Sequence, residues 1–252
     1  MTEKAEKKIR KLASWLEESQ SAYALTGAGV STDSGIPDFR GSGGLWTKRD
    51  PMEVASSRAL HDHPRDFFDF WTNRFAKLDK ASPNITHEVL AELESSGLLT
   101  GVITQNIDGL HVEAGSEQVF QVHGNFRFSK CEGCGKEVPT DNILERFEEG
   151  EVPYCRDCGE LIRPEVVLFG EQLPEDITQA EEELTKADLL IVLGSSLEVY
   201  PVASLVPHFE ATGGRLAIIN LDNTPFDPRA DFVHHGELRT VMTGLRQELE
   251  LS

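Results

Sequence analysis

The sequence of 252 residues has no long apolar run, and it is poor in cysteine, methionine and positive charge. No stretch approaches the roughly 18 apolar residues that a membrane-spanning helix needs. The opening segment, MTEKAEKKIRKLASWLEES, has no apolar core of the kind found in signal peptides. No internal repeat or low-complexity segment is visible. We therefore expect a cytoplasmic protein that spans no membrane and forms one domain, or a main domain with a smaller insert.

The shortage of basic residues restricts the partners that the protein can have. There are 24 basic and 43 acidic side chains, which give a net charge of -19. Nucleic-acid phosphates would be repelled, so no direct nucleic-acid binding is expected. The charge suits a lysine-rich peptide, but we favour the alternative explanation, which is solubility or adaptation to a salty cytoplasm. No assembly arm is evident, so we expect a monomer.

The four cysteines are the only ones in the chain, and they form two CxxC pairs separated by 20 residues. Two such pairs in an intracellular chain are typical of one tetrahedral zinc site. The alternative is a pair of disulfides, which a reducing cytoplasm disfavours. Four cysteine ligands leave no open position, so the zinc would be structural. The predicted ligands are Cys131, Cys134, Cys155 and Cys158.

Continuous apolar runs indicate the fold class. They occupy residues 21–27, 98–106, 187–196 and 214–222, and strands of this kind are covered by helices on both faces. Helical periodicity marks residues 3–19, 85–97 and 177–187. The alternation predicts an α/β protein with a Rossmann-like, doubly wound parallel sheet.

Two segments interrupt this pattern and predict a smaller module. Residues 42–80 are rich in aromatic and charged residues and are interrupted by Pro51 and Pro64. Residues 124–165 carry the cysteines. We expect a helical insert and a zinc-ribbon insert that pack together. The Rossmann-like domain would then comprise residues 1–41, 81–123 and 166–252.

A glycine-rich loop follows the first predicted strand, in the sequence LTGAGVSTDSG. Gly27 and Gly29 would let the backbone turn tightly and approach a pyrophosphate at a helix N-terminus. Ser31 and Thr32 are predicted to cap that helix. The spacing is not the usual dinucleotide fingerprint, so a purely structural turn is the alternative.

The residues after this loop carry a family resemblance. GAGVSTDSGIPDFRG, TQNIDGLH at 104–111, the pair His123–Gly124, RPEVVLFGE at 163–171, GSSLEVYP at 194–201 and NLDNTPFD at 220–227 occur in that order. Together with the two CxxC pairs they resemble the sirtuins, the NAD-dependent protein deacylases. The resemblance covers nearly the whole chain from residue 20 onward.

The resemblance implies an activity and a set of roles. An acyl-lysine oxygen would attack the NAD ribose carbon as nicotinamide leaves, and the final products would be free lysine and O-acyl-ADP-ribose. His123 is the implied general base, and Asn106 and Asp108 would hold the nicotinamide and its ribose. The implied NAD contacts are Gly27, Ala28, Gly29, Ser31, Ile36, Asp38, Phe39, Arg40, Gln105, Asn106, Ile107, Asp108, Gly194, Ser195, Ser196, Asn220, Leu221, Asp222 and Leu238.

Substrate peptides are implied to add as a β-strand between two stretches of chain. These contribute Val167, Phe169, Gly170, Glu171, Leu197 and Val199. Sirtuins that prefer succinyl or malonyl lysine carry a tyrosine and, three residues later, an arginine; here Trp71 and Arg74 have that spacing. The indole N–H could still bind a carboxylate. The alternative is that Arg74 is a solvated or salt-bridged helix residue and that Trp71 fills the pocket wall. We favour deacetylation over desuccinylation.

Two other functions compete with deacylation. Protein ADP-ribosyl transfer shares the NAD cleavage step, although no residue marks an acceptor. A non-catalytic NAD- or zinc-dependent interaction module is the second alternative, and the joint presence of His123, Asn106 and Asp108 argues against it.

Overall fold

The computed structural model describes residues 3–39, 44, 46 and 50–251, and its largest element is a parallel sheet. The six strands run in the order β3-β2-β1-β7-β8-β9, and every neighbouring pair is parallel. The strands are β1 (Ala22–Thr26), β2 (Gly101–Thr104), β3 (Val119–Gln121), β7 (Leu189–Leu193), β8 (Arg215–Asn220) and β9 (Phe232–His235). The strand order reverses direction beside β1, where open α/β sheets bind ligands at the carboxyl ends of their strands.

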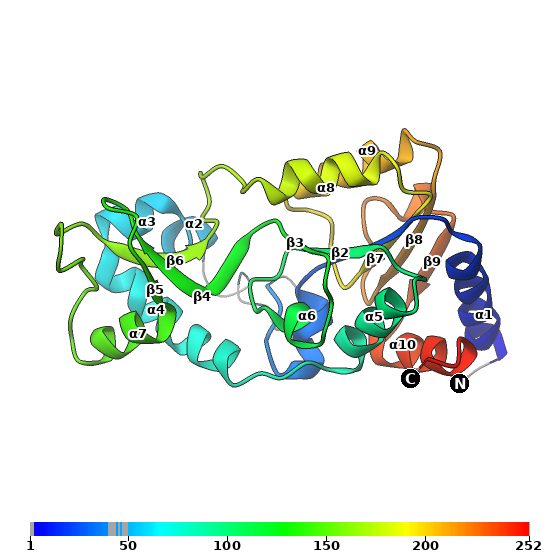
Figure 1. The fold of residues 1–252 in the computed structure, drawn as a ribbon, viewed down its shortest axis with the longest axis horizontal. Coiled ribbons are helices and arrows are strands. Elements are labelled where there is room, and N and C mark those ends of the chain that lie inside the picture. Colours follow the sequence, from blue (N-terminus) through cyan, green and yellow to red (C-terminus); the bar gives the residue numbers. More distant parts are fainter. Residues whose placement is uncertain (1–2, 40–43, 45, 47–49, 252) are drawn as a thin grey trace.

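Helices cover both faces of this sheet (Figure 1). One face packs against α1 (Glu3–Glu18), α5 (Ile85–Ser95) and α10 (Leu238–Glu248), and the other against α8 (Asp176–Leu184) and α9 (Leu205–Glu210). Alternate residues of β1 enter the two cores: Ala24 belongs to one cluster and Leu25 to the other. Because both faces are buried, the central strands β1 and β7 are almost entirely apolar, and the prediction of a doubly wound sheet is confirmed.

The two edge strands were not among the predicted strands. β3 is only three residues long, and β9 reads FVHH. Neither has enough apolar residues for a periodic signal. Both are edge strands, and each pairs with only one neighbour. Tertiary pairing with the central strands, and not local pattern, decides that these residues are extended.

The glycine-rich loop begins a 3₁₀ helix, η1 (Ala28–Ser34), and the predicted caps are wrong. Gly27 is the N-cap residue and makes no side-chain capping bond. Ser31 lies inside the helix, and its hydroxyl donates to Asp108 Oδ2 at 2.7 Å. Its side chain therefore belongs to the candidate site and does not cap the start of a helix.

A second group of helices and strands forms a small module at the other end of the molecule (Figure 1). It comprises the helices α2 (Pro51–Val54), α3 (Ser57–Asp62), α4 (Pro64–Asp79) and α7 (Thr140–Glu148) with an antiparallel sheet of β5 (Glu137–Pro139), β4 (Gly124–Cys131) and β6 (Ile162–Val166). Pro51 and Pro64 occupy first-turn positions, where a missing N–H does no harm. One apolar cluster contains Phe67 of α4, Phe126 of β4 and Phe147 of α7. The helical and cysteine-bearing segments thus share a core.

Short elements complete the chain. They are α6 (Leu110–Glu113), η3 (Val202–Ser204) and η4 (Asp227–Arg229). Within the described part of the chain, no helix combines the length and apolarity that crossing a bilayer requires.

Candidate functional site

A cavity of about 800 Å³ lies between the carboxyl ends of the parallel strands and the small module. It draws its walls from the loops after β1, β2, β7 and β8 and from the loop after β6. Of the predicted site residues, those that line it are Gly27, Ala28, Gly29, Ser31, Ile36, Asp38, Phe39, Trp71, Arg74, Gln105, Asn106, Ile107, Asp108, His123, Val167, Phe169, Gly170, Glu171, Gly194, Ser195, Ser196, Val199, Asn220, Leu221, Asp222 and Leu238.

Among the described residues predicted to contact NAD or the substrate, Leu197 alone is absent from this lining. Arg40 lies outside the described residues. Leu197 is 2 % exposed and packs in the core beneath the sheet, with a left-handed φ of 55°. Any contact that Leu197 makes with a substrate must therefore come from its backbone.

Gly27 and Gly29 are required by the packing of two loops. A Cβ at Gly27 would lie 2.8 Å from Gly194 O, and one at Gly29 would lie 2.8 Å from Gly194 Cα. The amide of Gly29 donates to Gly194 O at 2.9 Å. The loops after β1 and β7 therefore touch through backbone alone, which is a reason for glycine beyond approach to a phosphate.

Asp108 is the most enclosed charged group in the cavity wall, with 3 % exposure. Its Oδ2 accepts from Ser31 Oγ at 2.7 Å, and its Oδ1 accepts from the amide of Leu110 at 3.0 Å. Asn106 Nδ2 donates to Gly27 O and to Ser31 Oγ, each at 3.1 Å. Ser31 thus joins the two polar side chains and holds both in one orientation.

A pair of buried histidines lies behind Asp108. The rings of His87 and His111 are 4.8 Å apart, and His87 Nε2 lies 3.5 Å from Ser31 Oγ. His111 Nε2 is 3.0 Å from Thr26 Oγ1. Burial lowers the pKa of both rings, so both are neutral at pH 7. They support the polar wall from inside the protein without lining the cavity.

His123 follows β3 and precedes β4, at the junction of the large sheet and the small module. Its Nδ1 lies 3.0 Å from the Gln105 carbonyl oxygen. A carbonyl only accepts, so Nδ1 carries the proton and Nε2 keeps its lone pair. Burial lowers the pKa of His123, and the bond to Gln105 opposes part of that shift. The imidazole is therefore a neutral base near pH 7.

The glycine after His123 is also required by close packing. Gly124 has a φ of 77°, and a Cβ there would lie 2.1 Å from Glu165 O. Only glycine lets β4 leave the histidine and pair at once with β6. This contact fixes the position of the His123 backbone beside the small sheet.

The loop of residues 167–171 forms the wall between the cavity and the small module. Phe169 uses both backbone groups internally: its amide donates to Ala55 O at 2.9 Å, and its carbonyl accepts from Ser57 N at 3.2 Å. The amide of Val167 donates to His123 O at 2.9 Å. The Val167 carbonyl and both backbone groups of Gly170 have no backbone partner among the residues that the structure describes.

Arg74 enters the cavity wall from α4 and is 8 % exposed. Its guanidinium lies 4.3 Å from the Phe39 ring centroid, and its Nε has no hydrogen-bond partner within the described chain. Burial lowers the pKa of Arg74 to about 10, and Asp108 opposes this shift. The group is still cationic at pH 7, and it faces a cavity.

The Trp71 prediction is wrong in its chemistry. The indole Nε1 donates to Val54 O at 2.7 Å, so the N–H is not available to a ligand carboxylate. Trp71 is 4 % exposed and stacks on Phe75 at 5.3 Å between ring centroids. It is an apolar wall of the cavity, held by a bond that sequence spacing could not reveal.

Several aromatic residues that line the cavity carry no signal in the sequence. Trp46 stacks on Phe39 at 5.1 Å and meets the Phe169 ring edge-on at 6.5 Å. Tyr200 also lines the cavity and is 68 % exposed. The abundance of aromatics in 42–80 was visible, but which of them face the cavity depends on how α4 packs.

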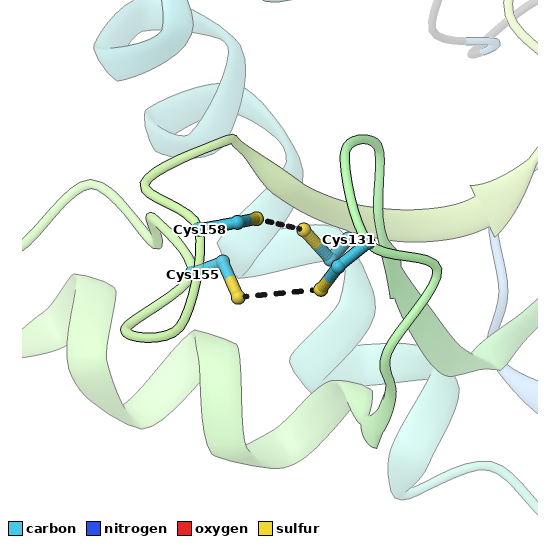
Figure 2. Close-up of side chains that lie close together, drawn as sticks. Cys131, Cys155 and Cys158 are labelled. Atoms are coloured by element: carbon cyan, nitrogen blue, oxygen red, sulfur yellow. Dashed lines mark hydrogen bonds between the residues drawn. The ribbon is translucent and has the colours of Figure 1, made fainter.

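The four cysteines come together in the small module (Figure 2). Cys131 Sγ lies 3.3 Å from Cys158 Sγ, and Cys134 Sγ lies 3.7 Å from Cys155 Sγ. Thiolates held about 2.3 Å from one zinc ion would be roughly 3.8 Å apart. The backbone N–H groups of Cys134 and Gly133 lower the pKa of Cys131 to about 7. This donor set fits a tetrahedral zinc ion.

Comparison with known proteins agrees with this geometry. A model of the Sir2 family matches residues 27–201. The chain belongs to the Sir2 family. It is 48 % identical over 227 residues to an NAD-dependent protein deacetylase of Caldivirga maquilingensis, covering 90 % of this chain and 88 % of that one. An NAD-dependent protein deacylase of Archaeoglobus fulgidus is 42 % identical over 247 residues, with 97 % of each chain covered.

Solved Sir2 structures have the same fold. One, bound to a deacetylated p53 peptide and 3'-O-acetyl-ADP-ribose, superposes with a TM-score of 0.94 at 40 % identity, covering 97 % of this chain and 100 % of that one. Another, bound to a p53 peptide and NAD, gives a TM-score of 0.91 at 39 % identity with the same coverage. The predicted resemblance and the fold class are both confirmed.

Proposed function

We propose that this chain removes acyl groups from protein lysines with consumption of NAD, and that acetyl is its preferred group. Its Sir2 relatives include NAD-dependent protein deacetylases and a deacylase. The observation that carries the proposal is the arrangement of His123 in the cavity wall. Its Nδ1 faces the Gln105 carbonyl at 3.0 Å, which leaves Nε2 as the basic atom.

His123 is proposed as the general base. When NAD is bound, it supplies the ribose carbon that takes the acyl oxygen as nicotinamide departs. His123 Nε2 then takes the proton of a ribose hydroxyl, and the Gln105 carbonyl stabilises the resulting imidazolium. Its lowered pKa keeps the ring unprotonated before this step.

Asn106 and Asp108 are proposed to bind the nicotinamide end. The Asn106 amide nitrogen donates to Gly27 O and to Ser31 Oγ, so we assign its side-chain oxygen to the ligand. Asp108 is nearly fully buried, and each of its side-chain oxygens retains a lone pair beyond its bond to Ser31 or Leu110. Pre-orientation by Ser31 reduces the entropy lost when the carboxamide binds.

The phosphates and the adenosine are assigned to the loops of the large sheet. Gln105 Nε2 donates to Ser195 Oγ at 2.9 Å, which orients that hydroxyl beside the loop contact of Gly27 with Gly194. Asn220 ends β8 and lines the cavity with Leu221 and Asp222. No cationic side chain lies among these last three, so a 2'-phosphate on the ribose would be disfavoured.

The substrate peptide is proposed to use the Val167 carbonyl and the Gly170 backbone. Since Phe169 spends both its backbone groups on Ala55 and Ser57, it can contribute only its ring. Strand addition through main-chain groups reads little side-chain sequence. We therefore expect acyl-lysine peptides of varied sequence to be accepted.

The zinc ion would be held by the four cysteines and would leave no coordination position open. Its chemistry is structural: it joins the CEGC and CRDC loops. None of the steps above passes through it.

Peptide-dependent release of nicotinamide tests the proposal. The protein would be incubated with NAD and either an acetylated peptide or its unmodified twin. A deacetylase releases nicotinamide only with the first and forms free lysine. Release with both peptides and labelling of the protein or peptide by ADP-ribose would indicate a transferase. NAD binding without release would indicate an interaction module.

Arg74 supports a second candidate, a preference for acyl groups that end in a carboxylate. Arg74 lines the cavity, and its buried Nε has no hydrogen-bond partner among the described residues; a carboxylate that bonds the guanidinium would compensate its charge. Turnover of acetyl and succinyl forms of one peptide, by wild type and Arg74→Met, decides. A desuccinylase loses only succinyl turnover, whereas equal losses mean that Arg74 supports the wall through Phe39.

We also propose the domain division predicted above, with 42–80 and 124–165 as inserts in an NAD-binding domain, and a cytoplasmic monomer that binds no nucleic acid. A site of four cysteine thiolates for zinc suits a reducing compartment, and the net charge of -19 opposes binding of polyanions. Light scattering and a salt-dependent DNA-binding assay would test the last two.

A further inference from the structure

An ion pair that sequence reasoning did not foresee lies under the loop of residues 167–171. Arg163 of β6 reaches Glu171 with both terminal nitrogens: Nη1 contacts Oε1, and Nη2 donates to Oε2 at 2.9 Å. The side chains are 16 % and 23 % exposed. Two parallel bonds between planar groups fix relative orientation as well as distance.

The pair also holds the loop backbone from two sides. Glu171 Oε2 accepts from the amide of Leu168 at 2.9 Å, and Arg163 Nη2 donates to the carbonyl of Val166 at 3.0 Å. These two contacts flank Val167, whose carbonyl is one of the groups assigned to the peptide. Although burial opposes it, bonds from Arg163 and Leu168 lower the pKa of Glu171, so the carboxylate is ionised at pH 7.

A weaker contact connects this pair with the metal loop. Arg163 Nη1 lies 3.9 Å from Glu132 Oε1. Glu132 stands inside the CEGC motif, and its amide donates to Leu161 O at 3.0 Å. Arg163 is therefore bordered by the metal loop on one side and by the peptide-binding loop on the other.

We propose that Arg163 and Glu171 form a positioning pair that keeps the Val167 carbonyl and the Gly170 backbone in place for the acyl-lysine peptide. This differs from the sequence prediction, in which Glu171 contacts the substrate, because its carboxylate is occupied by Arg163 and Leu168. Neither side chain touches the reacting atoms. The inference rests on the proposed function, since it names the support of the same peptide-binding wall.

The test compares Arg163→Met, Glu171→Gln, the double variant and Arg163→Lys with wild type. Steady-state rates would be measured with acetylated peptide varied at saturating NAD, and then with NAD varied at saturating peptide. We expect each single variant to raise the peptide KM about tenfold, with kcat and the NAD KM changed less than about twofold. The double variant should resemble the single ones, and Arg163→Lys, which keeps one charged bond, should recover part of the loss.

Direct binding of a fluorescent acetylated peptide without turnover supplies a second readout, and zinc content checks the metal loop. Arg215→Met, which removes the ion pair between Arg215 of β8 and Glu18 of α1, is the matched control and should change neither. If Arg163→Met fails to fold, Glu171→Gln, which keeps its size, carries the test. The proposal that Arg163 and Glu171 act as a positioning pair would be contradicted by either of two results. One is unchanged peptide binding in a zinc-loaded Glu171→Gln protein, and the other is additive losses in the double variant. Wild type that releases no nicotinamide with the peptide would instead refute the proposed function.

Discussion

The strands of the parallel sheet are covered on both faces, whereas the small sheet is covered on one. All five residues of β1 and of β7 are buried, but β4 alternates, with Phe126 and Ser129 buried and Arg127 and Phe128 exposed. The large sheet therefore rests on two apolar cores and the small one on a single core with a thiol cluster. Burial on one face stabilises less, so the small module depends more on its metal.

The two regions also differ in what they offer a ligand. The large sheet presents backbone loops that touch each other through glycine, and the small module presents side chains of α4, with the loop of residues 167–171 between the two regions. His123 stands at their junction, bonded to the large sheet through Gln105 and to the loop through its own carbonyl. Catalysis therefore requires that both regions keep their relative position.

Removal of the metal should have the largest effect, because it should unfold the small module and leave the parallel sheet folded. Cys155→Ser, or treatment with a strong chelator, should unfold the small module and abolish turnover, because structural zinc contributes on the order of 10 kcal/mol to folding. Limited proteolysis should cut within 124–166 while the parallel sheet stays protected. Asp157→Asn, in the same loop but paired with Lys136 alone among the residues that the structure describes, is the control. Unfolding of both regions together would show that they are not separable.

The second largest effect is expected from the loss of His123, the proposed base at the junction of the two regions. His123→Ala should lower kcat about 10²- to 10⁴-fold while NAD binding, measured by calorimetry, and zinc content stay close to wild type. The physical reason is that, among the described residues, only His123 combines a bond to the Gln105 carbonyl with a basic ring nitrogen in the cavity wall. Turnover near the wild-type rate would remove His123 from the mechanism.

Glycine substitutions sharpen the contrast between the two regions. Gly29→Ala places a Cβ 2.8 Å from the Gly194 backbone, so the loops after β1 and β7 must separate. We expect the NAD KM to rise roughly tenfold or more and the melting temperature to fall. Gly150→Ala, at a φ of 93° with nothing within 4 Å, should cost about 1 kcal/mol and leave the NAD KM unchanged. Equal effects on the NAD KM would contradict the contact argument.

The smallest effect is a shift in pH dependence. His123 acts as a base only when neutral, and burial lowers its pKa. The acid limb of kcat/KM should therefore have its midpoint below about 6.5, with activity rising as the pH rises through it. Zinc content would be measured at each pH, because protonation of thiolates in the small module would produce a separate loss. A midpoint above 6.5 in zinc-loaded protein would contradict the burial argument.

The sequence was most informative where one short segment carries the whole signal. The central strands are predicted because both faces are buried, which makes each a continuous apolar run, and the zinc site because two CxxC loops need only meet once. β3 and β9 were missed because short edge strands have no such run. The caps proposed for Ser31 and Thr32 were wrong because Asp108, distant in sequence, takes the Ser31 hydroxyl.

By itself the sequence determined the family, the order of the central elements, the metal ligands and the cofactor class, since each depends on residue identity at close spacing. Only the tertiary structure decided which atoms remain available. It shows that the Trp71 N–H is bonded to Val54, that Phe169 has no backbone group left for a peptide, and that Glu171 is paired with Arg163. These facts depend on contacts between distant segments, and spacing along a chain does not specify which hydrogen bonds such contacts consume.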